Sequence, residues 1–530
     1  MRLQNSLTWV LACWFTAPLL AADEPATLRL NQRTRVETTD GSDRYHTVTT
    51  AVDWEASKTA IVICDMWNDH YCRNSARRVA EMAPRMNELI KAARKQGVLI
   101  IHSPSGCMDR YADTPQRKLA QQAPEYETKI PLQGWCYLDE KHESQLPIVD
   151  SEPCDDDGEI RARVRFFNRQ IETLEIAPGD AITDSAEAFY LMKQRGITNV
   201  IVMGVHTNMC VLGRPFGIRQ MVYQGQNVVL MRDMTDTMYS PQQAPYVSHF
   251  TGNDLIHEHI ERHWCPTVTS ADILGGEPFR FPGDRRKHLA IVMAEDEYET
   301  ARTLPPFALR AFGKDFRISL VYANAEDRND LPGLNVLNDA DVAIFSIRRR
   351  TLPKRQLDIF RQFISSGKPL VALRTTSHAF CLWKKKPEEG LDEWPQFDRQ
   401  VLGGYYHNHH GNKLMTYVRV VEGAESHPVM RGVRTDEFRV LGSLYMSLPL
   451  ATSATALMTG RAEDLQPHEP VAWTNTSPAG GKVFYTSLGH PGDFEIPDVR
   501  RLLRNAVYWS ADLPAPKPEE KRAETTAGPC

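Results

Sequence analysis

A cysteine and an aspartate, each placed directly after an apolar run, are the residues of this chain best suited to chemistry. Cys210 closes the segment GVHTNMC, which follows the apolar run 200–203. Asp65 follows the apolar run 60–64. If both runs are strands of one parallel sheet, the two side chains lie at its carboxyl edge, where such folds keep their sites. A thiol at the start of the next helix would be acidified by the helix N-terminus, with the aspartate as a base.

Strand and helix patterns alternate around these two residues. Strands are predicted at 59–64 and 98–102, with a helix at 75–96 between them. Residues 103–165 interrupt the alternation with a long loop-rich insertion, which we expect to be a lid or a peripheral cap. Its acidic run at 155–157 lacks the spacing of a calcium loop and is interpreted as a solvated turn.

A second alternation begins at residue 288, after a charged, proline-containing linker. The pattern predicts two α/β domains, each a doubly wound, mainly parallel sheet between helical layers. The predicted strands of the second domain are 288–294, 318–322, 341–347 and 369–373, and its predicted helices include 354–366 and 498–510. The predicted parts of the chain are a signal peptide (1–22), a polar irregular arm (23–55), a first domain (56–276), a linker (277–287), a second domain (288–511) and a disordered tail (512–530).

Residues 56–276 resemble the isochorismatase-like cysteine hydrolases. The resemblance rests on ICDMWND at 63–69, on GVHTNMC, on NVVLMRDMTDT from 227 and on SADIL from 270. It implies an isochorismatase-like fold in which Asp65 is the base and Cys210 the nucleophile for hydrolysis of an amide-like C–N bond. It also implies an oxyanion hole of backbone N–H groups before the cysteine, a cis peptide between Val205 and His206, and pocket positions at Val205, His206 and Met209.

One element of that family's site has no counterpart in the sequence. The related hydrolases carry a lysine after the strand that precedes the helix leading into the nucleophile strand. At that place the chain reads EIAPGD, residues 175–180, without a lysine. Four cations of the insertion region remain as replacements, and none has motif support: Arg165, Arg169, Lys129 and Lys141.

Residues 288–511 resemble the ThuA-like (trehalose-utilisation) family, which shares the flavodoxin-like fold of class I glutamine amidotransferase domains. The resemblance rests on GKPLVALR from 367, GGYYH from 403, PVAW from 470, GKVFYTSLGH from 481 and LRNAVYW from 503. Where an amidotransferase has its cysteine elbow, this chain reads RTTSH, residues 374–378, so glutaminase chemistry is not expected. The family implies a link to sugar metabolism and no mechanism.

The N-terminus predicts export to the periplasm or the exterior. Arg2, the apolar run 7–20 and Ala21-Ala22 have the order of a secretory signal. After its removal nine of the ten cysteines remain, and Cys136 with Cys154 is the first disulfide pair to test.

Composition favours an enzyme acting on a small molecule. The chain has 530 residues, 42% hydrophobic and 24% charged, with a formal charge of −5, so we expect no nucleic-acid partner and no stable membrane insertion after signal cleavage. A homo-oligomer stays open. We expect no cofactor and no metal, and interpret His259, His263 and the dispersed histidines of the second domain as core or solvated residues. Two alternatives to the C–N hydrolase remain: a non-catalytic carbohydrate-binding or scaffolding protein, and a vinyl-ether hydrolase of the isochorismatase type.

Overall fold

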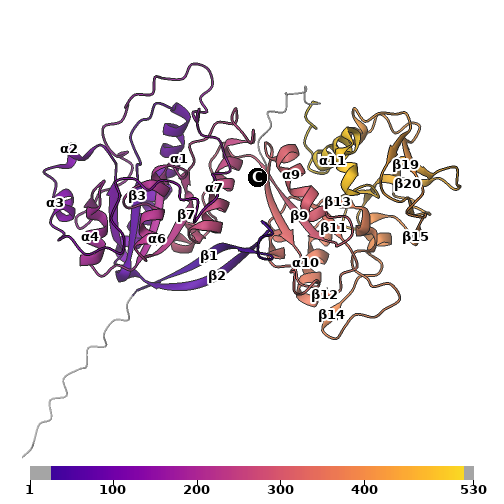
Figure 1. The fold of residues 1–530 in the computed structure, drawn as a ribbon, viewed down its shortest axis with the longest axis horizontal. Coiled ribbons are helices and arrows are strands. Elements are labelled where there is room, and N and C mark those ends of the chain that lie inside the picture. The colour runs from indigo at the N-terminus through magenta and orange to yellow at the C-terminus, as the bar shows by residue number, and fades with distance from the viewer. Residues whose placement is uncertain (1–25, 518–530) are drawn as a thin grey trace, which may run out of the picture.

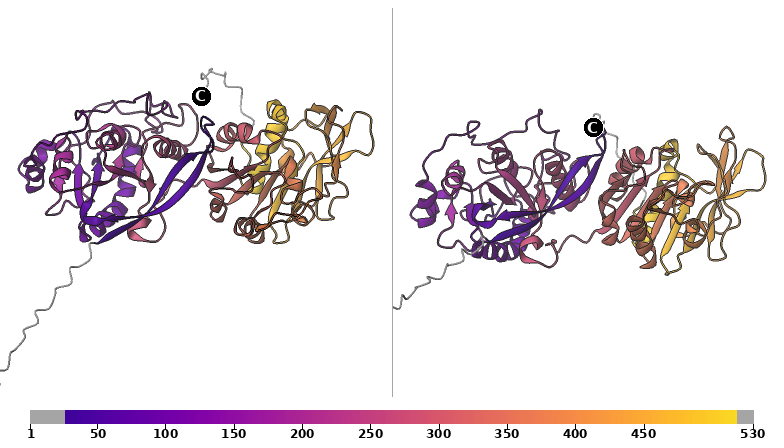
Figure 2. Two further views of the ribbon diagram at one scale, coloured as in Figure 1. Left: turned by 60° about the horizontal axis from the view of Figure 1, so that its bottom comes forward. Right: turned by 90° about the horizontal axis from the view of Figure 1, so that it is seen from below.

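The computed structural model describes residues 26–517, and the expected signal peptide lies outside them. Two α/β domains lie side by side, each built on one large sheet (Figures 1 and 2). The two-domain organisation and the α/β class therefore follow the prediction. Within the described residues, no helix combines the length and the apolar character that a membrane span needs.

The first sheet has eight strands in the order β2-β1-β8-β7-β6-β3-β4-β5. All neighbouring pairs from β8 to β5 are parallel, and β1 pairs antiparallel with β2 and β8. The strands are β1 (Thr27–Glu37), β2 (Tyr45–Glu55), β3 (Thr59–Cys64), β4 (Leu99–Ser103), β5 (Ala181–Ile182), β6 (Asn199–Val205), β7 (Asn227–Asp236) and β8 (Thr267–Val268). The helices are α1 (Arg73–Lys95), α2 (Met108–Tyr111), α3 (Pro115–Gln121), α4 (Glu187–Gln194), α5 (Cys210–Gly213), α6 (Ile218–Tyr223), α7 (His249–His263) and α8 (Ala271–Leu274).

Both faces of β3 are buried, which is why its sequence is apolar without alternation. Ile61 and Ile63 pack in one core cluster with the buried residues of α1. Ala60 and Val62 pack in the other cluster, with α4, α6 and α7. Helices on the two faces make the expected three layers. The loops that follow the parallel strands lie at the carboxyl edge of the sheet.

The arm at 23–55 is more regular than the sequence indicated. Residues 27–55 form a long antiparallel hairpin, β1 and β2, with eleven paired positions. In Figure 1 it runs along the bottom of the first domain towards the second. Polar residues are compatible with these strands because most of their positions are partly or fully exposed, so the prediction of an irregular arm was wrong.

The second sheet has nine strands in the order β10-β9-β11-β13-β21-β20-β19-β16-β17. Pairs from β10 to β21 are parallel and the remaining pairs are antiparallel. Its strands are β9 (Lys287–Ala294), β10 (Phe316–Tyr322), β11 (Val342–Ile347), β13 (Leu370–Leu373), β16 (Thr416–Val420), β17 (Phe438–Val440), β19 (Thr455–Ala462), β20 (Glu469–Thr476) and β21 (Lys482–Thr486). Two small sheets pair β12 (Leu352–Pro353) with β14 (Leu391–Asp392) and β15 (Asn408–His409) with β18 (Tyr445–Met446). The helices are α9 (Thr300–Phe312), α10 (Lys354–Ser365) and α11 (Pro497–Ser510).

The domains touch through polar contacts around the end of α9. The carbonyl oxygen of Gly313 accepts the Ser248 N–H at 3.0 Å and the Thr251 hydroxyl at 2.6 Å. Arg286 pairs with Asp254 at 2.8 Å. A cavity of about 310 Å³ at the same interface is lined by residues of both domains.

Candidate active site

The sheet register brings Asp65 and Cys210 to neighbouring strand ends. β3 and β6 are parallel partners, and Cys64 aligns with Gly204. Asp65, the residue after β3, is fully buried, and Cys210 begins α5 with 9% of its surface exposed. Gly204 permits the close crossing, because it has φ +103° and a Cβ there would lie 2.0 Å from the Cys64 carbonyl oxygen.

The Asp65 carboxylate is fixed through one oxygen only. Its Oδ1 accepts the N–H of Ser105 at 2.7 Å. Its Oδ2 is buried and accepts no hydrogen bond from the described residues. Burial raises the pKa of Asp65, and the Arg214 guanidinium acts in the opposite direction. The carboxylate is therefore a stronger base than an exposed aspartate, with one oxygen available to a proton donor.

Arg214 supplies the cation that the sequence lacked at the expected place. Its Nε lies 3.6 Å from Asp65 Oδ2, and its guanidinium stands 5.5 Å from the centre of the Trp135 ring. Burial and Asp65 raise the pKa of Cys210, and the same arginine opposes them. Arg214 follows Cys210 by four residues, about one helical turn, and that spacing was the only signal in the sequence that could have identified it.

The cations suggested by the sequence are engaged elsewhere. Arg169 pairs with Glu172 at 2.9 Å, and Arg165 stands over the ring of Phe167. Lys129 lies beside Gly225, and among the described residues neither it nor Lys141 pairs with Asp65. At the place of the family lysine, the carboxylate of Asp180 pairs with Arg94 at 2.8 Å and His102 at 3.1 Å.

The expected acidification of Cys210 by a helix is wrong. Burial raises the pKa of the thiol, Asp65 raises it further, and only Arg214 opposes them. Helix α5 spans four residues, so its dipole is too short to compensate. At neutral pH the thiol is protonated, and its nucleophilicity depends on a base that removes the proton during attack.

The turn before Cys210 has the backbone that the family resemblance implied. The peptide between Val205 and His206 is cis. His206 is buried and shares a hydrogen bond of 2.6 Å between its Nε2 and Ser75 Oγ. Burial, with help from His70, lowers the pKa of His206 to about 3, so the ring is neutral at physiological pH and suits a wall of the site. Met209 is half-buried and packs against Cys72, Cys154 and Met238.

A buried network of charged side chains lies next to the turn before Cys210. Arg78 of α1 donates to Asp236, the last residue of β7, at 2.8 Å. Asp236 also bonds His249 Nε2 at 2.8 Å and the Asn253 amide at 3.0 Å. The Asp236 carbonyl accepts the Thr207 N–H at 2.9 Å. The strand end that positions the turn is thus fixed by charge as well as by packing.

Residues of the insertion pack against the segment that follows Cys210. Trp135 packs against Gly213, where an added Cβ would lie 2.7 Å from the ring, and the Cys136 N–H donates to the Gly213 carbonyl at 2.7 Å. The suggested disulfide between Cys136 and Cys154 is wrong, because Cys136 Sγ contacts Gln220 and Cys154 lies beside Cys72. The eight cysteines of the described residues are all unbonded.

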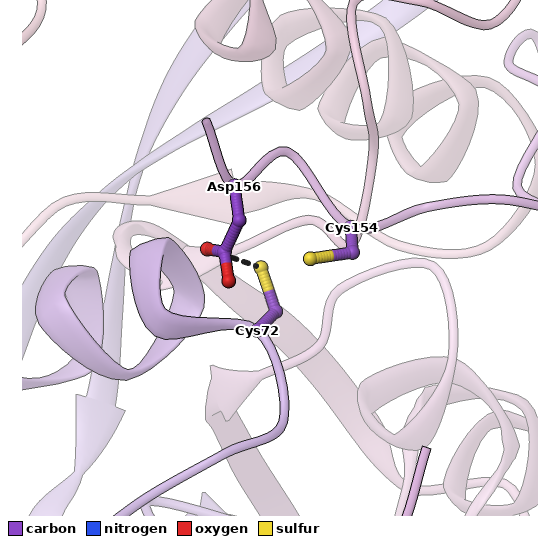
Figure 3. A group of neighbouring side chains, drawn as sticks. All are labelled: Cys72, Cys154 and Asp156. Atoms are coloured by element: carbon purple, nitrogen blue, oxygen red, sulfur yellow. Dashed lines mark hydrogen bonds between the residues drawn. The ribbon is translucent and has the colours of Figure 1, made fainter. Parts of the chain in front are cut away.

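The histidine candidates have ordinary partners. His259 Nε2 bonds Glu143 at 2.8 Å, and His263 Nε2 bonds the Ser144 hydroxyl at 3.2 Å. Within residues 26–517 the group of side chains that could hold a metal is a different one, Cys72, Cys154 and Asp156 (Figure 3). None of these three was singled out as a ligand from the sequence.

The corresponding edge of the second domain carries an arginine. Arg374 follows β13 with φ +44° and is 3% exposed. Its guanidinium donates to the Ser487 carbonyl at 2.6 Å and to the Tyr298 hydroxyl at 3.1 Å. His378 is buried and stacks on Tyr406, and burial lowers its pKa well below the usual value. No cysteine stands at this turn, as the sequence indicated.

Comparisons with known proteins gave one family match and several distant structural similarities. Residues 290–510 match the family model ThuA, described as trehalose utilisation. The comparison with curated proteins gave no match. A putative ThuA-like protein from Bacteroides uniformis is 18% identical and covers 44% of this chain and 95% of its own, with a TM-score of 0.33. A cysteine hydrolase from Pseudomonas syringae is 18% identical over 42% of this chain and 92% of its own, with a TM-score of 0.27. An isochorismatase from Pseudomonas putida is 16% identical and covers 41% of this chain and 91% of its own, with a TM-score of 0.26. The chain thus carries a ThuA domain in its C-terminal half, and the solved structures similar to its N-terminal part include isochorismatase-family cysteine hydrolases.

Proposed function

We propose that the first domain is a cysteine hydrolase that cleaves an amide-like C–N bond of a small molecule at Asp65, Cys210 and Arg214. The observation that carries the proposal is the buried carboxylate with one unsatisfied oxygen, placed beside a thiol and 3.6 Å from an arginine. Most buried carboxylate oxygens in proteins are hydrogen-bonded, so an unpaired one beside a thiol and a cation is a candidate for proton transfer. The free oxygen is the feature that a proton acceptor needs.

In the proposed reaction, the Asp65 carboxylate takes the thiol proton as Cys210 Sγ attacks the carbonyl carbon. The negative charge then moves to the carbonyl oxygen, and backbone N–H groups of the turn before Cys210 receive it. The C–N bond breaks, and the amine leaves with the proton returned by Asp65. Water hydrolyses the resulting thioester by the reverse sequence, which restores the thiol.

Arg214 affects the pKa of both groups that exchange the proton in this cycle. It lowers the pKa of Asp65, which keeps the carboxylate ionised and able to accept a proton. It also lowers the pKa of Cys210, which favours the thiolate formed during attack. A single cation next to both groups thus stabilises the negative charge on the Asp65 carboxylate before proton transfer and on the Cys210 thiolate after it.

The second domain enters the proposal as an accessory module with a link to sugar metabolism, since residues 290–510 match the trehalose-utilisation family model. We also propose that the protein is exported, on the signal-like order of residues 1–22. Detection of the mature protein in the periplasmic or extracellular fraction, starting near Asp23, tests the export. An intact Met1 on the native protein would contradict it.

The test of the catalytic proposal is a panel of small amides, carbamoyl compounds and one vinyl ether. The wild type should release an amine or ammonia from at least one amide-like compound. Hydrolysis of the vinyl ether alone would support the isochorismatase type of reaction, which needs no thiol attack. No turnover of any compound, with a folded protein, would favour the binding or scaffolding alternative.

A further inference from the structure

Two cysteines and an aspartate from distant parts of the first domain meet beside the first turn of α1. Cys72 is the N-cap of α1, and Cys154 and Asp156 come from the insertion (Figure 3). One donor atom from each lies within 4.8 Å of the other two, and Cys72 Sγ is 3.4 Å from Asp156 Oδ1. Cys72 is fully buried, Cys154 is 6% exposed and Asp156 is partly buried. The acidic run at 155–157 is therefore not the solvated turn that the sequence suggested.

The neighbouring charges leave Asp156 as the carboxylate available to a ligand. Asp155 is neutralised by Arg78, whose guanidinium donates to it at 2.7 and 3.0 Å. The two oxygens of Asp156 accept the backbone N–H groups of Arg73 at 2.9 Å and Asn74 at 2.7 Å. These bonds orient the carboxylate and leave lone pairs on each oxygen. The nearest cation to Asp156 is the half-exposed Arg73, at 3.8 Å.

We propose that Cys72, Cys154 and Asp156 bind one Zn²⁺ ion. Two thiolates and a carboxylate are ligands that zinc accepts, whereas Mg²⁺ and Ca²⁺ take oxygen ligands. With Zn–S bonds of about 2.3 Å, tetrahedral ligand atoms stand roughly 3.8 Å apart, so the three donors need only small movements. The ion replaces the two thiol protons, which pass to solvent, and water completes the tetrahedron. Its charge of +2 offsets most of the −3 carried by the two thiolates and the carboxylate.

The position of the site gives zinc a definite structural consequence. Cys72, Cys154 and Met238 form one small buried cluster, against which Met209 packs. Met209 directly precedes Cys210. A zinc ion would connect the insertion to α1. It would also stabilise the position of Met209, which precedes Cys210, without contacting the reacting atoms.

The experiment is zinc titration of the full chain after treatment with a chelator, in the presence of a non-thiol reductant. We expect one Zn²⁺ per chain by calorimetry. Cys72→Ser and Cys154→Ser should each weaken binding by about 100-fold or more, since loss of even an outer partner of a zinc ligand costs 10–100-fold. Cys136→Ser is the matched control, because Cys136 is equally buried in the same insertion but contacts Gln220. It should bind zinc as the wild type does.

Substitution of Co²⁺ provides a spectroscopic readout of thiolate ligation in the wild-type protein itself. Wild-type protein with Co²⁺ should show a thiolate-to-metal charge-transfer absorption, and Cys136→Ser should retain it. Absence of zinc binding, or binding unchanged in both Cys72→Ser and Cys154→Ser, would overturn the proposal. A Cys72–Cys154 disulfide in the protein as isolated, detected by peptide mass spectrometry without reductant, would also overturn it in favour of a redox cross-link.

Discussion

The two domains place a residue of similar backbone conformation at the same position of their sheets, with opposite charge. Asp65 follows β3 with φ +45°, and Arg374 follows β13 with φ +44°. Both are almost fully buried. The carboxylate of Asp65 has an unsatisfied oxygen facing a second charged group. The guanidinium of Arg374 bonds two backbone carbonyls and a tyrosine hydroxyl, from the Ser487, Ser443 and Tyr298 segments.

The difference shows why a shared sheet edge does not imply shared chemistry. In the first domain, a thiol from the neighbouring strand end completes a proton-transfer pair. In the second, Arg374 joins the loops that close over the strand ends, and the adjacent His378 is buried and neutral. We therefore propose hydrolytic chemistry for the first domain only.

The largest expected effect comes from removing the nucleophile or the base. Cys210→Ala and Asp65→Asn should each lower kcat/KM for the amide substrate by about 10³-fold or more. Far-ultraviolet circular dichroism and the melting temperature should stay close to those of the wild type, because the two side chains are small. Equal turnover by either variant would remove the distinction between the two domains.

Arg214 should have the next largest effect and should change the pH profile. Arg214→Gln removes a cation that lowers the pKa of Asp65, so the carboxyl becomes harder to ionise. The acidic limb of kcat/KM should therefore move to higher pH, with a loss of about 10²-fold at neutral pH. Arg214→Lys keeps the charge and should lose only about tenfold. An acidic limb that moves to lower pH in Arg214→Gln would contradict the assignment.

The independence of the domains can be tested by expressing residues 288–511 alone. Each domain has its own pair of core clusters, so the fragment should unfold in one sharp cooperative transition. Aggregation, or a broad transition without defined tertiary signals, would show that the interface around Gly313 is required for folding.

The smallest effect is expected from the second domain's buried histidine. His378→Gln should change hydrolysis by less than about twofold, because it touches no group of the first site. A large loss of activity with an unchanged melting temperature would mean that the two sheet edges act on one substrate.

Several features could be predicted from the sequence because they depend on local patterns. Apolar runs with both faces buried located β3, β6 and β9, and the order of short motifs identified Asp65 and Cys210. The hairpin β1–β2 could not be predicted, since only a few of its residues, Leu28, Leu30 and Trp54, pack in the core, and most of its other positions are polar residues held by pairing between the two strands. Arg214 was missed because its role depends on the distance to a residue far away in sequence. The grouping of Cys72 with Cys154 depends likewise on how the insertion folds back onto α1.

The proposed mechanism requires Cys210 to form a covalent bond with the substrate during turnover. The most direct measurement is mass spectrometry of the acid-quenched enzyme during hydrolysis of the best amide-like substrate. We expect the mass of the acyl group on the peptide that contains Cys210, absent in Cys210→Ala and reduced in Asp65→Asn. Turnover that persists in Cys210→Ala, with no acyl adduct on the wild type, would contradict the account.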